Sequence, residues 1–426
     1  MRTRRRAGQC ANQAVSQSWR PTPSVLRLLH DVAQAVGFTD GTRKGILVSL
    51  TAVECEGYMA FAKRTRLDLR QLTVVFGRNN SGKTTLARLP VFLASSLASS
   101  AFYSLEALGI TFGSSFPGLA SLDQPHPRIS LGLEWTQRHR LAATLQNVAS
   151  ADGRESVELL AVDIDGTVYE RALSSPRMGL GGISTGFMGK NEGALLEERQ
   201  RELRALLEGV VHVPSARPAV TPTYTTRDPN TTSVDEVPYL LASNHTLLGA
   251  VDQWFRDELE IGTIEVDKAA FAFRLAAREG AVSVNLASAG RGTQAVLPVA
   301  TILLGVATGQ LGAQLVIVEE PEAHLHPSAH GALADLAINA ASRAQVLVET
   351  HSENFILRVR RRVAEGRLGP DKLRLIYVDG GHLVSEVALD AAGGTDNWPH
   401  GVFESDIEEA EAIVRAKLEA FRGAQR

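Results

Sequence analysis

Cysteine is scarce in this chain, with only Cys10 and Cys55 among 426 residues. Two thiols cannot build a disulfide framework or a four-cysteine metal site, so we expect a reducing, cytoplasmic location. Long apolar runs are also missing, and none approaches the ~20 residues that span a bilayer. This absence predicts a protein without a membrane-spanning helix.

Lysine is rare as well: it supplies seven of the 44 basic residues. The formal net charge of −3 argues against a protein whose whole surface grips nucleic acid, although a local basic face stays open. The basic start, MRTRRRAGQCANQAVSQSW, precedes no apolar stretch and so does not predict a secretory signal. A frayed tail and a mitochondrial-type presequence both remain open.

Apolar patterning predicts the elements that follow. The runs ILVSLTAVE and RLDLRQLTVVFG favour strands, TTLARLPVFLASSLASS favours a helix, and residues 128–173 alternate like an antiparallel meander. Residues 178–193 form a glycine-rich loop, LLEERQRELRALLEGV an amphipathic helix, and VVHVPSAR a strand with a turn. Two helices are expected within 239–259, separated near Asn244.

Strands and helices alternate in the last third of the chain. Strands are expected within 262–284, in QLVIVEE and in QVLVET, with helices over 293–308, in AHGALADLAINAAS and in NFILRVRRRVAEG. LRLIYVD and HLVSEVAL predict a closing hairpin around Asp379 and Gly380. This order predicts an α/β fold with a parallel sheet core beside an antiparallel β lobe.

The expected organisation has five segments. They are a basic tail (1–43), an N-terminal lobe with the meander (44–180), a helical and loop insertion (181–261), a C-terminal lobe (262–406) and a charged helix (407–426).

A phosphate-binding loop follows the apolar strand LTVVF and precedes a helix. Glycines let the chain turn tightly around an anion, and the helix start adds partial positive charge. Lys83 is expected to reach the β- and γ-phosphates of ATP, and the Thr84 hydroxyl to hold Mg²⁺. The residues expected to bind nucleotide here are Gly77, Asn79, Asn80, Ser81, Gly82, Lys83, Thr84 and Thr85.

Two acids end the apolar strand in QLVIVEEPEAHLHP. Glu319 is expected to support Mg²⁺ through water, and Glu320 to polarise the attacking water as general base. A solvated turn is the alternative for such a pair. In QVLVETHSENF, His351 after the next strand is expected to contact the γ-phosphate or the water. In ASAGRGTQAVLP, Ser288, Gly290 and Gly292 would present polar groups at a helix start.

Together these stretches resemble the ABC/SMC-type ATPases, and more closely the OLD-like AAA-15/AAA-21 branch. GRNNSGKTT is similar to that branch's phosphate loop, VIVEEPEAHLHP to its acidic block and ETHSENFILRVRRRV to its histidine block. LEGVVHVPSARP and NWPHGVFESD resemble uncharacterised AAA proteins with a terminal WPxGFF segment. The resemblance covers about half of the chain, mainly 45–90 and 262–406.

The resemblance implies an ABC-type P-loop NTPase head that binds ATP and Mg²⁺ and hydrolyses ATP as a head-to-head homodimer. Glu319 and Glu320 would be the Walker B pair, His351 the switch histidine, and 290–294 the signature, acting in trans. The signature departs from LSGGQ, and no Q-loop glutamine can be placed. Such ATPases often serve anti-phage or DNA-maintenance systems, with an effector protein or nucleic acid as partner.

Several alternatives stay open. One is a nucleotide-binding scaffold for an effector, with little turnover, and a more distant one is a transporter ATPase. About 75 residues follow His351 without an Asp-x-Asp cluster, which argues against the TOPRIM nuclease domain of OLD proteins. His324, His326 and His330 suggest either a metal site or packing beside the dimer seam. The basic run 358–372 could contact phosphate backbone or pair with the acidic tail.

Overall fold

The computed structural model describes residues 48–121, 127–149, 155–171, 188–230, 232–379 and 383–399, together with Val402 and Val414. The expected tail (1–43) lies outside this range, as do most of the loop 178–193 and all of 407–426 except Val414. Within the described residues, no helix is both long and apolar enough to cross a membrane.

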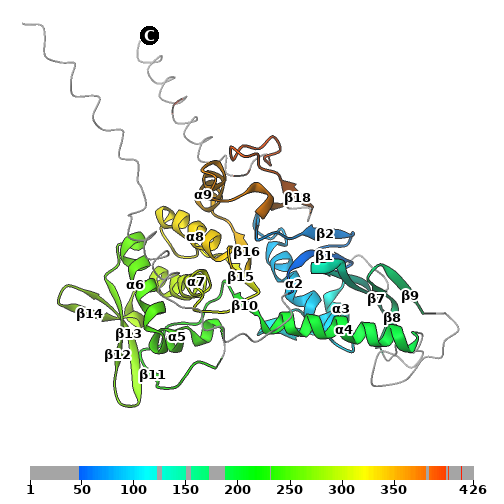
Figure 1. Cartoon of the computed structure of the whole chain (residues 1–426), viewed down its shortest axis with the longest axis horizontal. Helices are drawn as coiled ribbons and strands as arrows, with labels where there is room; N and C mark the ends of the chain where they lie inside the picture. Colours follow the sequence, from blue (N-terminus) through cyan, green and yellow to red (C-terminus); the bar gives the residue numbers. More distant parts are fainter. Residues whose placement is uncertain are drawn as a thin grey trace, which may run out of the picture. The chain divides into compact units, whose positions relative to one another are not determined.

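A six-stranded core sheet organises the molecule, and its first five strands run parallel (Figure 1). The last strand pairs antiparallel, as the predicted closing hairpin requires. The order across the sheet is β10 (Val210–Val213), β15 (Leu315–Glu319), β16 (Gln345–Thr350), β3 (Leu72–Gly77), β17 (Leu373–Val378) and β18 (Val384–Val387). The strand between the phosphate-loop strand β3 and the acidic strand β15 is therefore β16.

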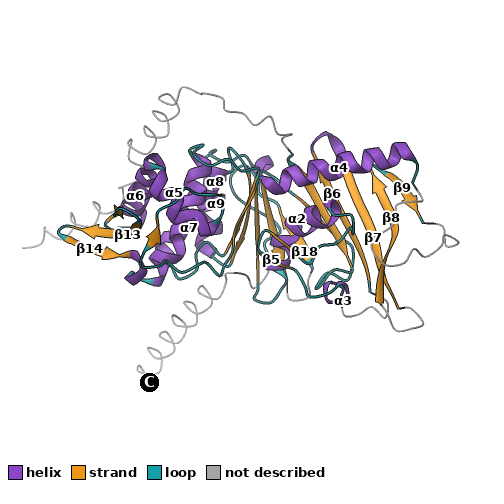
Figure 2. Ribbon diagram, turned by 90° about the horizontal axis from the view of Figure 1, so that it is seen from below, coloured by secondary structure: helices purple, strands orange, loops and turns teal. Residues whose placement is uncertain are grey.

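The core sheet is buried on both faces, because its strands are mostly apolar and successive side chains point to opposite faces. On β3, Val74 and Phe76 belong to one hydrophobic cluster, while Val75 between them belongs to the other. Figure 2 shows helices α5 to α9 on one side of these strands and α2 on the other. The helices are α2 (Lys83–Ala98), α3 (Phe116–Leu119), α4 (Lys190–Glu208), α5 (Val237–Ser243), α6 (His245–Leu259), α7 (Arg291–Ala307), α8 (Pro327–Ala340) and α9 (Glu353–Ala364).

An antiparallel sheet packs against the α2 side of the core, as the alternating meander predicts. Its order is β2 (Thr65–Asp68), β1 (Leu50–Glu56), β6 (Arg128–Trp135), β7 (His139–Ala149), β8 (Glu155–Ile164) and β9 (Thr167–Glu170). A turn at Asp165 and Gly166 joins the last two strands, where Asp165 has φ 52° and Gly166 φ 89°. Beside these strands, β4 (Glu106–Ala107) pairs with β5 (Ile110–Thr111).

Helix α4 is joined to this lobe through one buried carboxylate. Glu202 accepts a hydrogen bond from Trp135 Nε1 at 2.7 Å and lies 2.9 Å from His139 Nδ1. Its other oxygen accepts from Arg199 at 3.1 Å, so the buried charge is fully paired.

A smaller antiparallel sheet lies on the opposite side, next to α6. Its strands are β11 (Tyr224–Thr225), β12 (Thr263–Lys268), β13 (Ala272–Glu279) and β14 (Val282–Asn285). The two helices predicted within 239–259 are present, and the Asn244 side chain caps the second by accepting from Leu247 N at 3.0 Å.

The expected helical insertion at 181–261 is not a separate body in the described residues. Helix α4 packs against α2, β10 forms the edge of the core sheet, and α5 and α6 belong to the opposite hydrophobic cluster. Its short strand β10 pairs in parallel with β15, about one hundred residues further along the chain. Helix α4 comes before this strand and helices α5 and α6 come after it, so the segment contributes to both sides of the core sheet.

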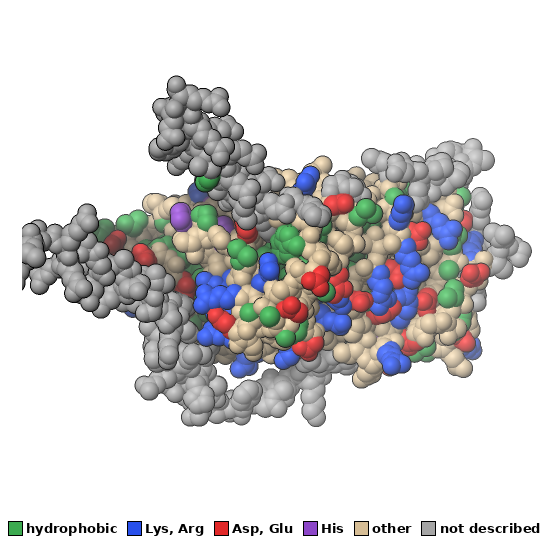
Figure 3. All heavy atoms as spheres, turned by 90° about the horizontal axis from the view of Figure 1, so that it is seen from above, with side chains coloured by type: hydrophobic (Ala, Val, Ile, Leu, Met, Phe, Trp, Pro, Cys, Tyr) green, Lys and Arg blue, Asp and Glu red, His purple; other side chains and the backbone are tan. Residues whose placement is uncertain are grey.

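The basic run at the end of α9 is engaged within the fold. Arg358 and Arg362 pair with Asp335 of α8, Arg361 pairs with Glu365, and Arg360 lies 5.2 Å from the Trp398 ring. Figure 3 shows basic and acidic side chains interspersed over the described surface of one face. These partners are Asp335 of α8, Glu365 just after α9 and the ring of Trp398, and they test neither alternative for this run.

Candidate nucleotide-binding site

The phosphate loop begins where β3 ends, at a position that only glycine can occupy. Gly77 has φ 147°, and a Cβ there would lie 2.0 Å from the carbonyl oxygen of Val378 on the neighbouring strand. At the other end of the loop, Gly82 adopts the left-handed conformation at the N-cap of α2, with φ 97°. The two glycines thus allow the tight strand-to-helix turn that the sequence predicts.

The start of α2 has no side-chain cap and no acidic residue in its first turn. The amides and the dipole there are thus not used by a capping or acidic side chain. Lys83 is the first helical residue and is buried, with Nζ donating to the Arg78 carbonyl at 2.5 Å. Burial lowers the pKa of Lys83, while Glu349 and Glu320 act in the opposite direction.

Glu319, at the end of β15, has no exposed surface and all its hydrogen-bonding capacity is used within the chain. Arg88 donates to it twice, at 2.5 Å from Nε and 2.8 Å from Nη2. His212 Nε2 lies 2.8 Å away, and the Ser215 amide donates at 3.2 Å. Burial alone would raise the pKa of Glu319, but the hydrogen bonds from Arg88 and His212 outweigh it and lower the pKa to about 2.

Arg217 holds the backbone of both acids that end β15. Its Nη2 donates to the Glu319 carbonyl at 2.8 Å and to the Glu320 carbonyl at 2.7 Å. Glu320 has φ 42°, an uncommon conformation for a residue with a side chain, and its amide donates to the Glu349 carbonyl at 2.8 Å. Burial lowers the pKa of Arg217 to about 10, so the guanidinium stays charged at neutral pH.

Glu349, near the end of β16, is the carboxylate that contacts the phosphate loop. Thr84 Oγ1 donates to its Oε1 at 2.6 Å. The other oxygen, Oε2, is buried and has no hydrogen-bond partner among the described residues. Burial, with the charges of Glu319 and Glu320, raises the pKa of Glu349 to about 7 against the opposing effects of Thr84 and Lys83.

Helix and strand geometry together explain which acid meets which partner. Glu319 and Glu349 pair at the same register on adjacent parallel strands, so their side chains point to the same face. Thr84 and Arg88 are four residues apart and lie one above the other on α2. The first turn of the helix therefore contacts Glu349, and its next turn contacts Glu319.

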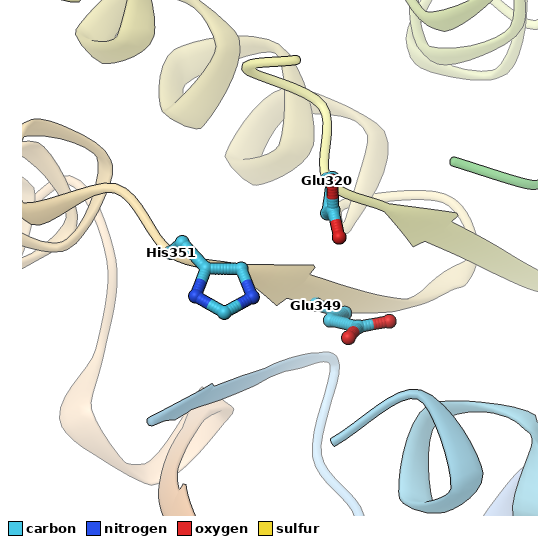
Figure 4. A group of neighbouring side chains, drawn as sticks. All are labelled: Glu320, Glu349 and His351. Atoms are coloured by element: carbon cyan, nitrogen blue, oxygen red, sulfur yellow. The ribbon is translucent and has the colours of Figure 1, made fainter. Parts of the chain in front are cut away.

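Glu320, Glu349 and His351 converge at this rim of the sheet (Figure 4). One ligand atom from each lies within 4.8 Å of the others, and they form the single such group of three or more acidic, cysteine or histidine residues in the described part of the chain. Burial lowers the pKa of His351, and Lys83 adds to this effect while Glu320 opposes it. A neutral imidazole beside two carboxylates can accept a proton, donate a hydrogen bond or bind a cation.

A further acid ties the two strand ends together. Glu322 Oε1 accepts from the Thr350 hydroxyl at 2.8 Å and from the His351 amide at 2.7 Å. Burial raises the pKa of Glu322 against these hydrogen bonds. The turn after β15 and the turn after β16 are thus joined by one carboxylate oxygen.

The histidines of the HLHP segment join no group of metal-ligand atoms among the described residues, and two of them form hydrogen bonds within the chain. His326 caps α8, accepting from the Ser328 amide at 3.3 Å, and His330 Nδ1 lies 2.7 Å from Ser352 Oγ. His324 has φ 67° in the turn and joins no group of metal-ligand atoms among the described residues. The packing alternative agrees with these contacts.

Ser288, Gly290 and Gly292 lie at the start of α7, with Ser288 ending the short 3-10 turn η3 (Leu286–Ser288). A Cβ at Gly292 would lie 2.6 Å from the His324 carbonyl oxygen, so this helix start packs closely on the HLHP turn. Helix α7 belongs to the hydrophobic cluster on one face of the core sheet, and α2 to the cluster on the other.

The structure therefore brings Lys83, Thr84, Glu320 and His351 together. The sequence reasoning missed Arg88, His212, Arg217 and Glu349. Glu349 carried a usable signal, because it is an acid near the end of a buried strand, two residues before His351. His212 and Arg217 lie within LEGVVHVPSARP, the stretch that resembles uncharacterised AAA proteins.

Comparison with known proteins finds one family. Residues 192–358 match a family described as "AAA domain, putative AbiEii toxin, Type IV TA system". No curated protein matches the chain.

Similar solved structures include an SMC head domain from Thermotoga maritima, which is 12% identical, with 80% of this chain and 99% of that chain covered and a TM-score of 0.40. Another is an Smc head domain with an extended coiled coil, bound to the C-terminal domain of ScpA, from Pyrococcus furiosus. It is 11% identical, with coverage of 87% and 99% and a TM-score of 0.43. Over residues 192–358 the chain is thus similar to an AAA domain family, and this segment holds Glu319, Glu320, Glu349 and His351 but not the phosphate loop.

Proposed function

We propose that the protein binds ATP with Mg²⁺ and hydrolyses the bond between its β- and γ-phosphates. The observation that carries this proposal is the convergence of Lys83, Thr84, Glu320, Glu349 and His351 around the uncapped start of α2. A similarity to AAA domains over residues 192–358 supports it.

The residues present fit a nucleotide and its metal ion. Gly77 and Gly82 shape a main-chain cradle, and the loop amides with Lys83 and Thr85 would hold the phosphates. The buried, unpartnered Oε2 of Glu349 is an oxygen of the kind that Mg²⁺ prefers, and it lies on the carboxylate bonded to Thr84. When bound, the ion would supply positive charge at the phosphate oxygens.

Glu320 and His351 would act on the water. The hydrogen bond from Arg217 and the φ of 42° hold the backbone of Glu320 in one position and so orient its side chain. From there the Glu320 carboxylate can accept a proton from a water beside the phosphates. His351, whose pKa is lowered by burial, can hydrogen-bond that water or a phosphate oxygen.

Lys83→Ala tests nucleotide binding directly. Loss of a charge-assisted contact of about 1.5–3 kcal/mol should weaken ATP binding about 10- to 100-fold, measured by titration with a fluorescent ATP analogue. Arg343→Ala, in the turn before β16 and so at the opposite end of the parallel strands from the phosphate loop, provides a matched loss of one positive charge. Undiminished affinity of Lys83→Ala protein would remove the phosphate loop from the proposal.

A head-to-head homodimer forms part of the proposal. The signature residues Ser288, Gly290 and Gly292 lie at the start of α7, a helix on the opposite face of the core sheet from α2, so they would serve a second subunit's nucleotide. Glu320→Gln should bind ATP, stop turnover and accumulate as a dimer, seen by light scattering with and without ATP. Unchanged phosphate release would favour the nucleotide-binding scaffold and remove Glu320 as the base.

The family description points to a toxin of a two-component defence system, and we propose that role for this ATPase. Expression should slow growth of the host cell, and Lys83→Ala should abolish the effect.

Incubating the purified protein with DNA, Mg²⁺ and Mn²⁺ tests for an intrinsic nuclease. We expect no cleavage, with any cutting carried out by a partner protein.

A further inference from the structure

We propose that Glu349, at the end of the strand before His351, is the carboxylate that faces the nucleotide-bound metal ion, in the place expected for Glu319. This assignment rests on the proposed ATP-Mg²⁺ function and deepens it.

Glu319 is already neutralised by partners that cannot easily leave. Both of its oxygens are bonded to Arg88 at 2.5 and 2.8 Å, and His212 and the Ser215 amide fill the remaining directions. Its side chain has no exposed surface. Turning this carboxylate toward a metal would break a buried ion pair, which costs several kcal/mol.

Glu349 has the opposite arrangement. Its Oε1 accepts from the hydroxyl of Thr84, the residue that the phosphate-loop pattern assigns to Mg²⁺. Its Oε2 is buried without a hydrogen-bond partner among the described residues, although the residue is only 2% exposed. Leaving a buried polar atom unpaired is unfavourable, and a bound cation would supply the missing partner.

The neighbouring groups complete the case for a cation. Glu320 and His351 each place a ligand atom within 4.8 Å of one on Glu349, and these three residues lie on the turns and strands that meet at the phosphate loop (Figure 4). Because Glu319 and Glu320 both repel a charged Glu349, a divalent cation at Oε2 would relieve this repulsion. The alternative is a purely structural Glu349 that only positions Thr84.

Glu349→Gln separates the two, because the amide oxygen can still accept from Thr84 while the charge is lost. The affinity for a fluorescent ATP analogue is measured with Mg²⁺ and with EDTA. We expect the Mg²⁺-dependent gain to fall about 10- to 100-fold, the range for loss of groups that support a metal, with affinity in EDTA within twofold of wild type. Glu202→Gln, a buried carboxylate of the antiparallel lobe, should keep the full gain.

A full Mg²⁺ gain in Glu349→Gln, or loss of the gain in Glu319→Gln alone, would overturn the assignment while leaving ATP binding intact. Failure of the wild-type protein to bind nucleotide in either condition would instead overturn the proposed function itself. The two failures are therefore distinguishable in one titration.

A change of metal preference gives a second readout. Thiolate sulfur favours softer ions than Mg²⁺. Glu349→Cys should therefore lose the Mg²⁺-dependent gain in nucleotide affinity and recover a gain with Cd²⁺. The wild-type protein should show its gain in nucleotide affinity with Mg²⁺ alone. No recovery by Cd²⁺ in a folded variant, verified by circular dichroism, would count against direct contact between residue 349 and the ion.

Discussion

The ends of β15 and β16 carry acids at the same register, yet the two acids have opposite surroundings. Glu319 accepts from an arginine, a histidine and an amide, and its pKa falls to about 2. Glu349 accepts from one threonine hydroxyl, keeps an unpartnered buried oxygen, and its pKa rises to about 7. The place of a carboxylate in a sequence motif therefore does not decide its chemistry. Its partner does, because Thr84 in the first turn of α2 meets Glu349 while Arg88 in the next turn meets Glu319.

Removing Arg88 should give the largest effect on this contrast. Arg88→Met leaves the fully buried Glu319 without its bidentate partner, and breaking a buried pair typically costs 3–5 kcal/mol. Because Arg88 itself is 30% exposed, we expect about 3 kcal/mol lower free energy of unfolding in urea. Glu319→Gln in the same chain should recover part of the loss. A loss below about 1 kcal/mol would show that Glu319 needs no cation beside it.

Glu349→Gln should change how stability depends on pH. The folded pKa of Glu349 is raised from 4.5 to about 7, so its contribution to stability is complete below pH 4.5 and is lost as pH rises through 7. At about 1.36 kcal/mol per pKa unit, the wild type should lose up to about 3 kcal/mol across this window relative to the variant. Urea unfolding in EDTA at pH 5 and pH 8 measures the difference.

Glu319 provides the opposite sign for that experiment. Its lowered pKa gives stability that is present above pH 4.5 and is lost as pH falls toward 2. Parallel pH profiles for wild type and Glu349→Gln would contradict the contrast between the two acids.

Arg217→Met should affect turnover more than binding. Two backbone carbonyls lose their charged donor, so Glu320 is no longer held in place, and we expect kcat for ATP to fall about tenfold or more with KM little changed. Arg217→Lys, which keeps the charge but lacks the planar fork, should lie between the two. Equal activity of Arg217→Met and wild type would show that the carbonyls need no such support.

His212→Leu should give the smallest effect, since Glu319 keeps both bonds to Arg88. Loss of one hydrogen bond to a carboxylate should lower the free energy of unfolding by about 1.5 kcal/mol, measured in urea. A loss as large as that of Arg88→Met would mean that the histidine, and not the arginine, holds the charge.

Much of the fold could be predicted because its elements are local. Apolar runs that end in glycine or acids mark β3 and β15, and alternation marks the antiparallel lobe. The strand in VVHVPSAR was also predictable, but its place at the edge of the core sheet was not. That place depends on parallel pairing with a strand about one hundred residues away.

The site divides in the same way. Lys83 and Thr84 follow from glycine spacing, and Glu320 and His351 from strand ends. The role of Glu349 depends on β16 lying between β15 and β3, and on the helical turn that separates Thr84 from Arg88. Neither relation can be read from a local stretch of sequence, so the role of Glu349 within a predicted strand cannot be predicted from the sequence alone.

The start of α7 lies close to the HLHP turn, because a Cβ at Gly292 would lie 2.6 Å from the His324 carbonyl oxygen. Two residues before His324, the Glu322 carboxylate accepts a hydrogen bond from the His351 amide. If the proposed homodimer forms through the start of α7, a shift of that helix would reach His351 and the end of β16 through these few contacts.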